Sequence, residues 1–189
     1  MFPLCSFYSP FDFGAMNHVD EDEFLSLFSD TDMRDDDRAT YESFLNECRK
    51  GQSFLLVCDN CGEIVLDKLM LEQLKKRFPH LTLKALVRGK DVLNDATEED
   101  ATYTGLAGMA EIVSNGEAIA GTIYEMMPEE ARKVLDDADV ILAKGQGNYE
   151  SMSGQGWHVF YEFLCKCDLF TSRFNVPRLT GMFVEEILR

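Results

Sequence analysis

The sequence predicts an α/β fold with three layers, α/β/α, built on a mostly parallel sheet. From residue 53 onward, short apolar segments alternate with longer segments whose apolar residues recur at helical spacing. Such alternation is typical of strands joined by crossover helices, which cover both faces of the sheet. The length of 189 residues and the apolar content of 46% are sufficient for one substantial core.

The first 50 residues differ from the rest in charge, since they hold 12 acidic and 4 basic residues. We expect residues 1–50 to form a small acidic helical segment ahead of an α/β domain over residues 51–189. Apolar residues at near-helical spacing predict one helix around 24–28 and a second over 38–50. The acidic run between them is interpreted as a solvated loop and helix start, because Asp is favoured near the positive end of the helix dipole.

The α/β domain is predicted to begin with a strand at residues 53–58 and to continue in regular order. Further strands are expected at residues 81–87, 110–114, 140–143, 157–165 and 181–185. Helices are expected at residues 63–78, from 97 onward, at 128–136 and at 167–174. Thr97 and Asp100 have the spacing of a capping pair at a helix start. Residues 144–149 are expected to form a turn, because two glycines follow the strand closely.

The charge and composition exclude several classes of partner. A net charge of −16 repels a phosphate backbone, so nucleic acid and anionic membrane are not expected as general partners. No apolar run approaches the roughly 20 residues that a membrane-spanning helix needs. Because the first residues lack the basic region of a secretion signal, a cytoplasmic protein with free thiols is expected.

The six cysteines allow one sharper interpretation. Cys58 and Cys61 have the C-x2-C spacing of zinc ligands, and Cys165 and Cys167 could supply two more sulfurs. C-x-C is a poor match to the usual second half of such a site. Packed free thiols are therefore favoured over a zinc site.

Oxygen-bearing side chains follow the first two expected strands of the sheet. Asp59 and Asn60 come after the first strand, and Asn94 and Asp95 come in the loop after the second. Because parallel strands end at the same edge of a sheet, we expect these four side chains to lie close together. Carboxylate and amide oxygens suit hard cations such as Mg²⁺ and Mn²⁺. In the alternative interpretation, Asp59 or Asn60 only caps the following helix.

Neighbouring residues could supply acid–base chemistry and phosphate binding. Glu63 is a candidate for a general base, for an outer partner of the metal, or for stabilisation of the helix dipole. Lys144 with Gly145, Gly147 and Asn148 could hold a phosphate through backbone N–H groups and one cation. The segment is neither a dinucleotide-binding nor a Walker motif, so NAD, ATP and GTP are not expected as cofactors.

Four sequence blocks in fixed order resemble the damage-control phosphatase family, which was once a domain of unknown function and was also linked to an acidic-residue methyltransferase. The blocks are residues 59–67, 87–97, 114–116 and 143–150, and the resemblance extends over residues 11–184. It implies a three-layer α/β/α core. It also implies hydrolysis of small phosphorylated metabolites, such as damaged sugar phosphates, with a divalent ion: Mn²⁺, Mg²⁺, Co²⁺ or Ni²⁺.

The resemblance also implies roles for single residues. It implies that the divalent ion is bound by Asp59, Asn60 and Asp95. The residues expected to act in catalysis are Asp59, Asp95 and Glu63. The residues expected to bind the substrate are Asn94, Arg88, Lys144, Gly145, Gly147, Asn148 and Lys166. In one route Asp59 or Asp95 becomes phosphorylated first. We expect water to attack the phosphorus directly instead, because the metal would occupy the oxygens of both aspartates.

The chain departs from the family at its start. Family members carry a helical region ahead of the segment that residues 11–15 resemble, and Ser9-Pro10 stands where Gly-Asn is usual. Residues 1–50 are therefore expected to be the remnant of that region. Its shortening would leave the pocket open, lower the stability, or require a second copy or a partner chain to cover the exposed surface.

The sequence leaves two other functions open. An S-adenosylmethionine-dependent carboxyl methyltransferase would need a glycine-rich turn after the first strand, where the sequence has only Gly62. A truncated, inactive relative that binds a metal or metabolite is the other alternative.

Overall fold

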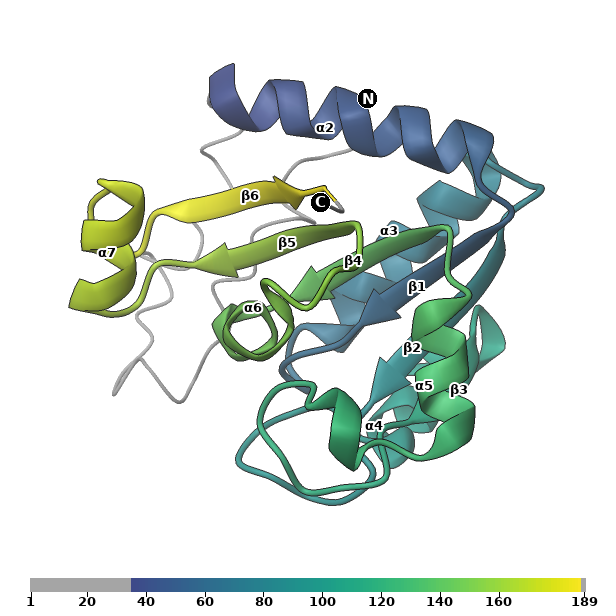
Figure 1. The fold of residues 1–189 in the computed structure, drawn as a ribbon. Helices are drawn as coiled ribbons and strands as arrows, with labels where there is room; N and C mark the ends of the chain where they lie inside the picture. The colour runs from purple at the N-terminus through teal and green to yellow at the C-terminus, as the bar shows by residue number, and fades with distance from the viewer. Residues whose placement is uncertain (1–34, 188–189) are drawn as a thin grey trace.

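The computed structural model describes residues 35–187, which form a six-stranded sheet with helices on both faces (Figure 1). The strand order is β3-β2-β1-β4-β5-β6, and every neighbouring pair is parallel except β5 with β6. The strands are β1 (Ser53–Val57), β2 (Thr82–Val87), β3 (Glu111–Ser114), β4 (Val140–Lys144), β5 (Val159–Leu164) and β6 (Gly181–Glu186). The predicted α/β fold with a mostly parallel sheet is confirmed.

The helices divide between the two faces of the sheet. Within residues 35–187 the α-helices are α2 (Asp35–Lys50), α3 (Ile64–Arg77), α4 (Glu98–Thr104), α5 (Glu129–Asp136), α6 (Gln146–Met152) and α7 (Asp168–Phe174). The same residues contain the short 3-10 helices η2 (Leu106–Gly108) and η3 (Tyr124–Met126). Buried residues of α2, α3 and α4 form one hydrophobic core with one face of the sheet. Those of α5, α6 and α7 form a second core with the other face. These two cores make the three layers.

Successive residues of a strand belong alternately to the two cores. In β1, Phe54 and Leu56 belong to the first core, whereas Leu55 and Val57 belong to the second. Both faces of this central strand are thus covered, which explains why it reads as a continuous apolar run. None of the helices that the structure describes is long and apolar enough to cross a membrane.

Helix α2 packs directly onto the sheet, although it belongs to the acidic N-terminal segment. The ring of Phe44 makes edge-to-face contacts with Phe54, Phe160 and Phe183 at centroid distances of 6.1, 5.3 and 5.9 Å. The described part of that segment therefore shares the core of the α/β domain. The helix expected at 24–28, the segment 11–15, and Ser9-Pro10 lie outside the described residues.

Two local details concern helix starts. The capping pair is confirmed, because the Thr97 side chain accepts a hydrogen bond from the Asp100 backbone and the Asp100 side chain accepts one from the Thr97 backbone. Residues 146–149, expected as part of a turn, instead begin helix α6. The two glycines suggested a turn, but Asn148, Tyr149 and Met152 are buried, so packing stabilises a helix of low intrinsic propensity there.

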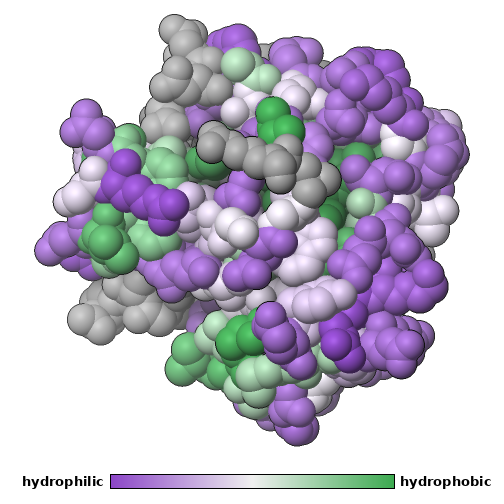
Figure 2. All heavy atoms as spheres, in the orientation of Figure 1, coloured by the Kyte–Doolittle hydropathy of each residue, from purple (hydrophilic) through white to green (hydrophobic). Residues whose placement is uncertain are grey.

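The strand order places a crevice at one edge of the sheet. The chain continues from β1 to β2 on one side and from β4 to β5 on the other, so β1 and β4 flank the point where the order reverses. Ligands bind outside the carboxyl ends of the strands at such a point. Hydrophilic side chains dominate the face of the molecule that Figure 2 shows, as expected for a chain of charge −16.

Candidate metal and phosphate site

A cavity of about 370 Å³ lies at the carboxyl ends of β1, β2, β4 and β5. It is lined by Asp59, Asn60, Leu93, Asn94, Asp95, Ala120, Gly121, Gln146, Gly147 and Lys166. The structure thus brings together the four oxygen-bearing residues that the sequence placed at one edge. Asn60 and Asp95 also form an isolated antiparallel bridge between the two loops.

Asp59 lies against the backbone at the end of β4. A Cβ atom built on Gly145 would be 2.1 Å from both Cγ and Oδ2 of Asp59, so no larger residue fits there without displacing the carboxylate. Gly145 also has a φ of +82°, which favours glycine. The glycine after β4 therefore makes room for the Asp59 carboxylate.

Negative charge accumulates around Asp59. Burial and the nearby carboxylates of Glu63 and Asp95 together raise the pKa of Asp59 to about 8, although Lys166 and Arg88 oppose the shift. A cation bound among these oxygens would stabilise the ionised carboxylates that otherwise repel one another.

The amide of Asn60 is oriented by its neighbours. Its Nδ2 donates hydrogen bonds to Oδ2 of Asp59 at 3.0 Å and to Oε1 of Glu63 at 3.2 Å. With the nitrogen occupied by two carboxylates, the oxygen is the part of the amide that remains suited to a cation. Helix α3 has Glu63 as its N-cap and no side-chain capping hydrogen bond, so neither Asp59 nor Asn60 acts as its cap.

Arg88 is a buried partner of Asp95. Its Nε donates to Oδ2 of Asp95 at 2.6 Å, while Nη1 and Nη2 donate to Thr122 Oγ1 at 3.4 Å and Asn148 Oδ1 at 3.3 Å. Asn148 in turn donates from Nδ2 to the carbonyl oxygens of Cys58 and Lys144. This network joins the ends of β1, β2 and β4.

Arg88 and Asn148, both predicted to bind the substrate, make their observed contacts with protein groups. Both side chains are buried and bound to protein groups, and neither lines the cavity. Thr122, which joins the network by donating to Asn148, was missed because it lies in a long loop without any motif.

Lys144 also lies below the cavity and not in its lining. It is 2% exposed, and its Nζ is 3.1 Å from Glu162 Oε1, 3.4 Å from Asp67 Oδ1 and 3.9 Å from Glu63 Oε2. Burial opposes its charge, but these three carboxylates raise the pKa of Lys144. Lys144 and Gly145 are predicted to bind the substrate, but both are buried and neither lines the cavity. Three acidic side chains surround the Lys144 ammonium.

Lys166 is the cation in the lining of the cavity, and it is only half-buried. Its charge lowers the pKa of Asp59, so it acts on the same group as the predicted ion. Its backbone N–H donates to Oε1 of Gln146 at 3.3 Å. Gln146 was not among the predicted site residues, although it lies in the glycine-containing segment. Lys166 thus supplies a positive charge to a cavity lining that also contains Asp59 and Asp95.

The donor set fits a divalent ion held by oxygens. Asp59, Asn60 and Asp95 line one cavity, and their two carboxylates and one amide oxygen are ligands that hard cations prefer. Among the side chains that the structure describes, no three from His, Cys, Asp and Glu gather into a metal site by themselves. Cys58 and Cys165 are buried free thiols, whereas Cys61 and Cys167 are exposed free thiols.

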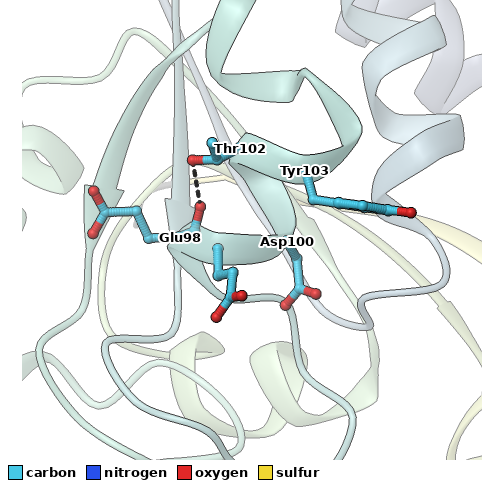
Figure 3. A pocket seen from close by; sticks show the side chains of 5 residues that line it. Glu98, Asp100, Thr102 and Tyr103 are labelled. Carbon is cyan, nitrogen blue, oxygen red and sulfur yellow. Dashed lines mark hydrogen bonds between the residues drawn. The ribbon is translucent and has the colours of Figure 1, made fainter.

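A larger surface hollow of about 760 Å³ lies over helix α4 (Figure 3). It is lined by Glu98, Glu99, Asp100, Thr102 and Tyr103, and the Thr102 hydroxyl donates to the carbonyl oxygen of Glu98. Three carboxylates without a cation in the lining repel a phosphorylated ligand. The smaller cavity, which contains Lys166, is the better phosphate site.

Comparison with known proteins gives a consistent family match. Residues 10–179 match the damage-control phosphatase ARMT1-like domain. The chain is 35% identical over 161 residues to a damage-control phosphatase of Archaeoglobus fulgidus and 29% identical over 161 residues to one of Pyrococcus horikoshii, covering 84% of this chain in both cases. It spans 54% of the length of each of these relatives.

A solved structure shows the same architecture. The crystal structure of a DUF89 family protein from Pyrococcus horikoshii superposes with a TM-score of 0.76 at 26% identity. The similarity covers 87% of this chain and 56% of that one.

Proposed function

Because the chain belongs to the family of ARMT1-like damage-control phosphatase domains, we propose that it hydrolyses small phosphorylated metabolites with a divalent metal ion. The observation that carries the proposal is the single cavity into which the oxygens of Asp59, Asn60 and Asp95 and the cation of Lys166 are gathered. Phosphomonoester hydrolysis needs both parts, a hard-metal site and a positive group for the phosphoryl oxygens.

Asp59, Asn60 and Asp95 would hold the ion, which is Mg²⁺, Mn²⁺, Co²⁺ or Ni²⁺ in this proposal. When bound, such an ion polarises a phosphoryl oxygen and acidifies a water molecule. Arg88 keeps the Asp95 carboxylate in place through the contact of 2.6 Å between Nε and Oδ2. Gly145 keeps space for the Asp59 carboxylate.

Lys166 would bind the phosphate of the substrate. Its position in the cavity lining, with Gln146 and Gly147, lets it offset the charge of the transferring group. Asn94 and Leu93 line the cavity from the loop after β2 and would contact the remainder of the metabolite. Water would attack the phosphorus directly, since the aspartate oxygens would be occupied by the ion.

Glu63 would support the site without touching the substrate. It is 4% exposed and does not line the cavity, and its Oε1 accepts the hydrogen bond from Asn60. An outer partner of the metal is therefore the role that we propose, in place of a general base.

The free thiols at Cys48, Cys58, Cys61, Cys165 and Cys167 fit a reducing compartment, and we propose the cytoplasm.

The test is an assay of phosphate release from a panel of phosphomonoesters, including sugar phosphates, with each of the four ions and with a chelator. We expect turnover only with added metal, and we expect Asp59→Ala to abolish it. Asp168→Ala is the matched control, because this exposed carboxylate lies outside the cavity. Turnover that persists both with chelator and in Asp59→Ala would refute the proposal. Methyl transfer from S-adenosylmethionine without metal would favour the alternative enzyme class.

A further inference from the structure

Four charged side chains form a buried cluster beneath the cavity: Glu63, Asp67, Lys144 and Glu162. Their exposed fractions are 4%, 0%, 2% and 2%. They come from three elements that are separate in sequence, since Glu63 and Asp67 belong to the start of α3, Lys144 ends β4 and Glu162 lies in β5. The ammonium of Lys144 lies 3.1 to 3.9 Å from the nearest oxygen of each carboxylate.

This buried cluster is not expected to stabilise the folded state, because its charges do not balance. One cation faces three carboxylates, and among the described residues Lys144 is the cation that pairs with Asp67 and Glu162. Replacing a buried ionic group by apolar residues of similar volume is often neutral or stabilising. A cluster of this kind therefore calls for a functional explanation.

The buried cluster is connected to the cavity at one point. Glu63 turns Oε2 toward Lys144 at 3.9 Å and accepts the Asn60 hydrogen bond with Oε1 at 3.2 Å. The same Asn60 nitrogen donates to Asp59. A continuous path of polar contacts thus runs from Lys144 through Glu63 to Asn60 and Asp59.

We propose that Lys144 is a positioning residue for the metal site: it fixes Glu63, and through Glu63 the amide of Asn60, while Asp67 and Glu162 hold the ammonium in place. The inference rests on the proposed metal-dependent function. Without the Glu63 carboxylate in this position, the Asn60 amide can rotate and present its nitrogen instead of its oxygen to a cation. Asp67 and Glu162 thereby gain a role although neither reaches the cavity.

The experiment measures the dissociation constant of Mn²⁺ by electron paramagnetic resonance on the full chain, without substrate. The variants are Lys144→Met, Glu63→Gln and the double variant. Loss of an outer partner lowers metal affinity by about 10-fold to 100-fold, so we expect each single variant to weaken Mn²⁺ binding by roughly 10-fold. Because both act through one path, the double variant should also be weakened by about 10-fold, and not 100-fold.

Two further variants keep this test decisive. Lys144→Met combined with Glu162→Gln removes one cation and one carboxylate together, and it replaces Lys144→Met in the cycle if that variant does not fold. Lys133→Met is the control, since this exposed lysine pairs with Asp137 and neither residue lines the cavity; Mn²⁺ affinity should be unchanged.

The outcomes separate the two proposals. Losses that multiply in the double variant, or a Lys144→Met protein with the Mn²⁺ affinity of the wild type, would overturn the positioning role and leave the phosphatase proposal standing. A wild-type protein that binds no Mn²⁺, Mg²⁺, Co²⁺ or Ni²⁺ would overturn the metal-dependent function itself. Coupled losses with an unchanged control support both.

Discussion

Substitution of Gly145 by alanine tests the contact between the end of β4 and the Asp59 carboxylate. The new methyl group would lie 2.1 Å from Cγ of Asp59, whereas ordinary van der Waals contact begins at 3.4 Å. The carboxylate must therefore move by about 1 Å or more. A displacement of that size in a reacting group can cost about 100-fold in rate.

The same substitution also strains the backbone. At a φ of +82°, alanine costs roughly 1–2 kcal/mol relative to glycine. We expect Gly145→Ala to lower the free energy of unfolding by about this amount, to weaken Mn²⁺ binding by about 10-fold to 100-fold, and to reduce kcat/KM by about 100-fold. Urea unfolding, Mn²⁺ titration and phosphate release measure the three quantities.

Gly154→Ala is the matched control for backbone strain. Gly154 has a φ of +81°, and a Cβ atom there would meet nothing within 4 Å. This variant should lose similar stability while keeping metal affinity and turnover. If Gly145→Ala binds Mn²⁺ and turns over substrate as well as Gly154→Ala does, Asp59 does not hold the ion where we propose.

Three further predictions follow from the placement of the charged side chains. Lys166→Ala should raise KM for phosphomonoesters at least 10-fold with Mn²⁺ affinity within about 3-fold of the wild type, and steady-state kinetics showing an unchanged KM would remove Lys166 from the substrate. Arg88→Met leaves the buried carboxylate of Asp95 without its partner at 2.6 Å and should cost about 3–5 kcal/mol in urea unfolding; a loss below about 1 kcal/mol would contradict that role. Burial raises the pKa of Glu162 to about 8 from its ordinary 4.5, with Glu63 and Asp67 adding to the shift and Lys144 opposing it. Glu162 therefore loses its proton at a lower pH in the unfolded chain than in the folded one. Between pH 4.5 and about 8 the folded state binds more protons, so its stability falls as the pH rises, by at most about 1.4 kcal/mol per pH unit. Glu162→Gln should make unfolding less dependent on pH in that window, and an unaltered slope would show that Glu162 does not carry the shift.

The gathering of Asp59, Asn60, Asn94 and Asp95 could be predicted because it depends on a short-range pattern. Each pair follows an apolar strand, and parallel neighbouring strands must end at the same edge. The strand order and the helices on both faces then place that edge at a crevice. No knowledge of individual side-chain contacts is needed for this step.

The roles of the cations could not be predicted in the same way. Arg88, Lys144 and Lys166 all follow strand ends, yet only Lys166 lines the cavity. Glu162, in the middle of an apolar strand, is a sequence signal that a buried cation lies nearby. Helix α6 was missed for a related reason, since burial of Asn148 and Tyr149 stabilises it against its glycine content.

The sequence by itself determined the α/β fold, because the alternation of strand and helix periods leaves few ways to bury both faces of a sheet. It also determined which edge carries the oxygen-bearing side chains of Asp59, Asn60, Asn94 and Asp95. Only the tertiary structure decided which positive charge faces the cavity and which is buried. The position of the Lys144 ammonium depends on carboxylates of α3 and β5, which folding brings next to β4. The residues around Lys144 in the sequence do not show that these carboxylates will lie beside it.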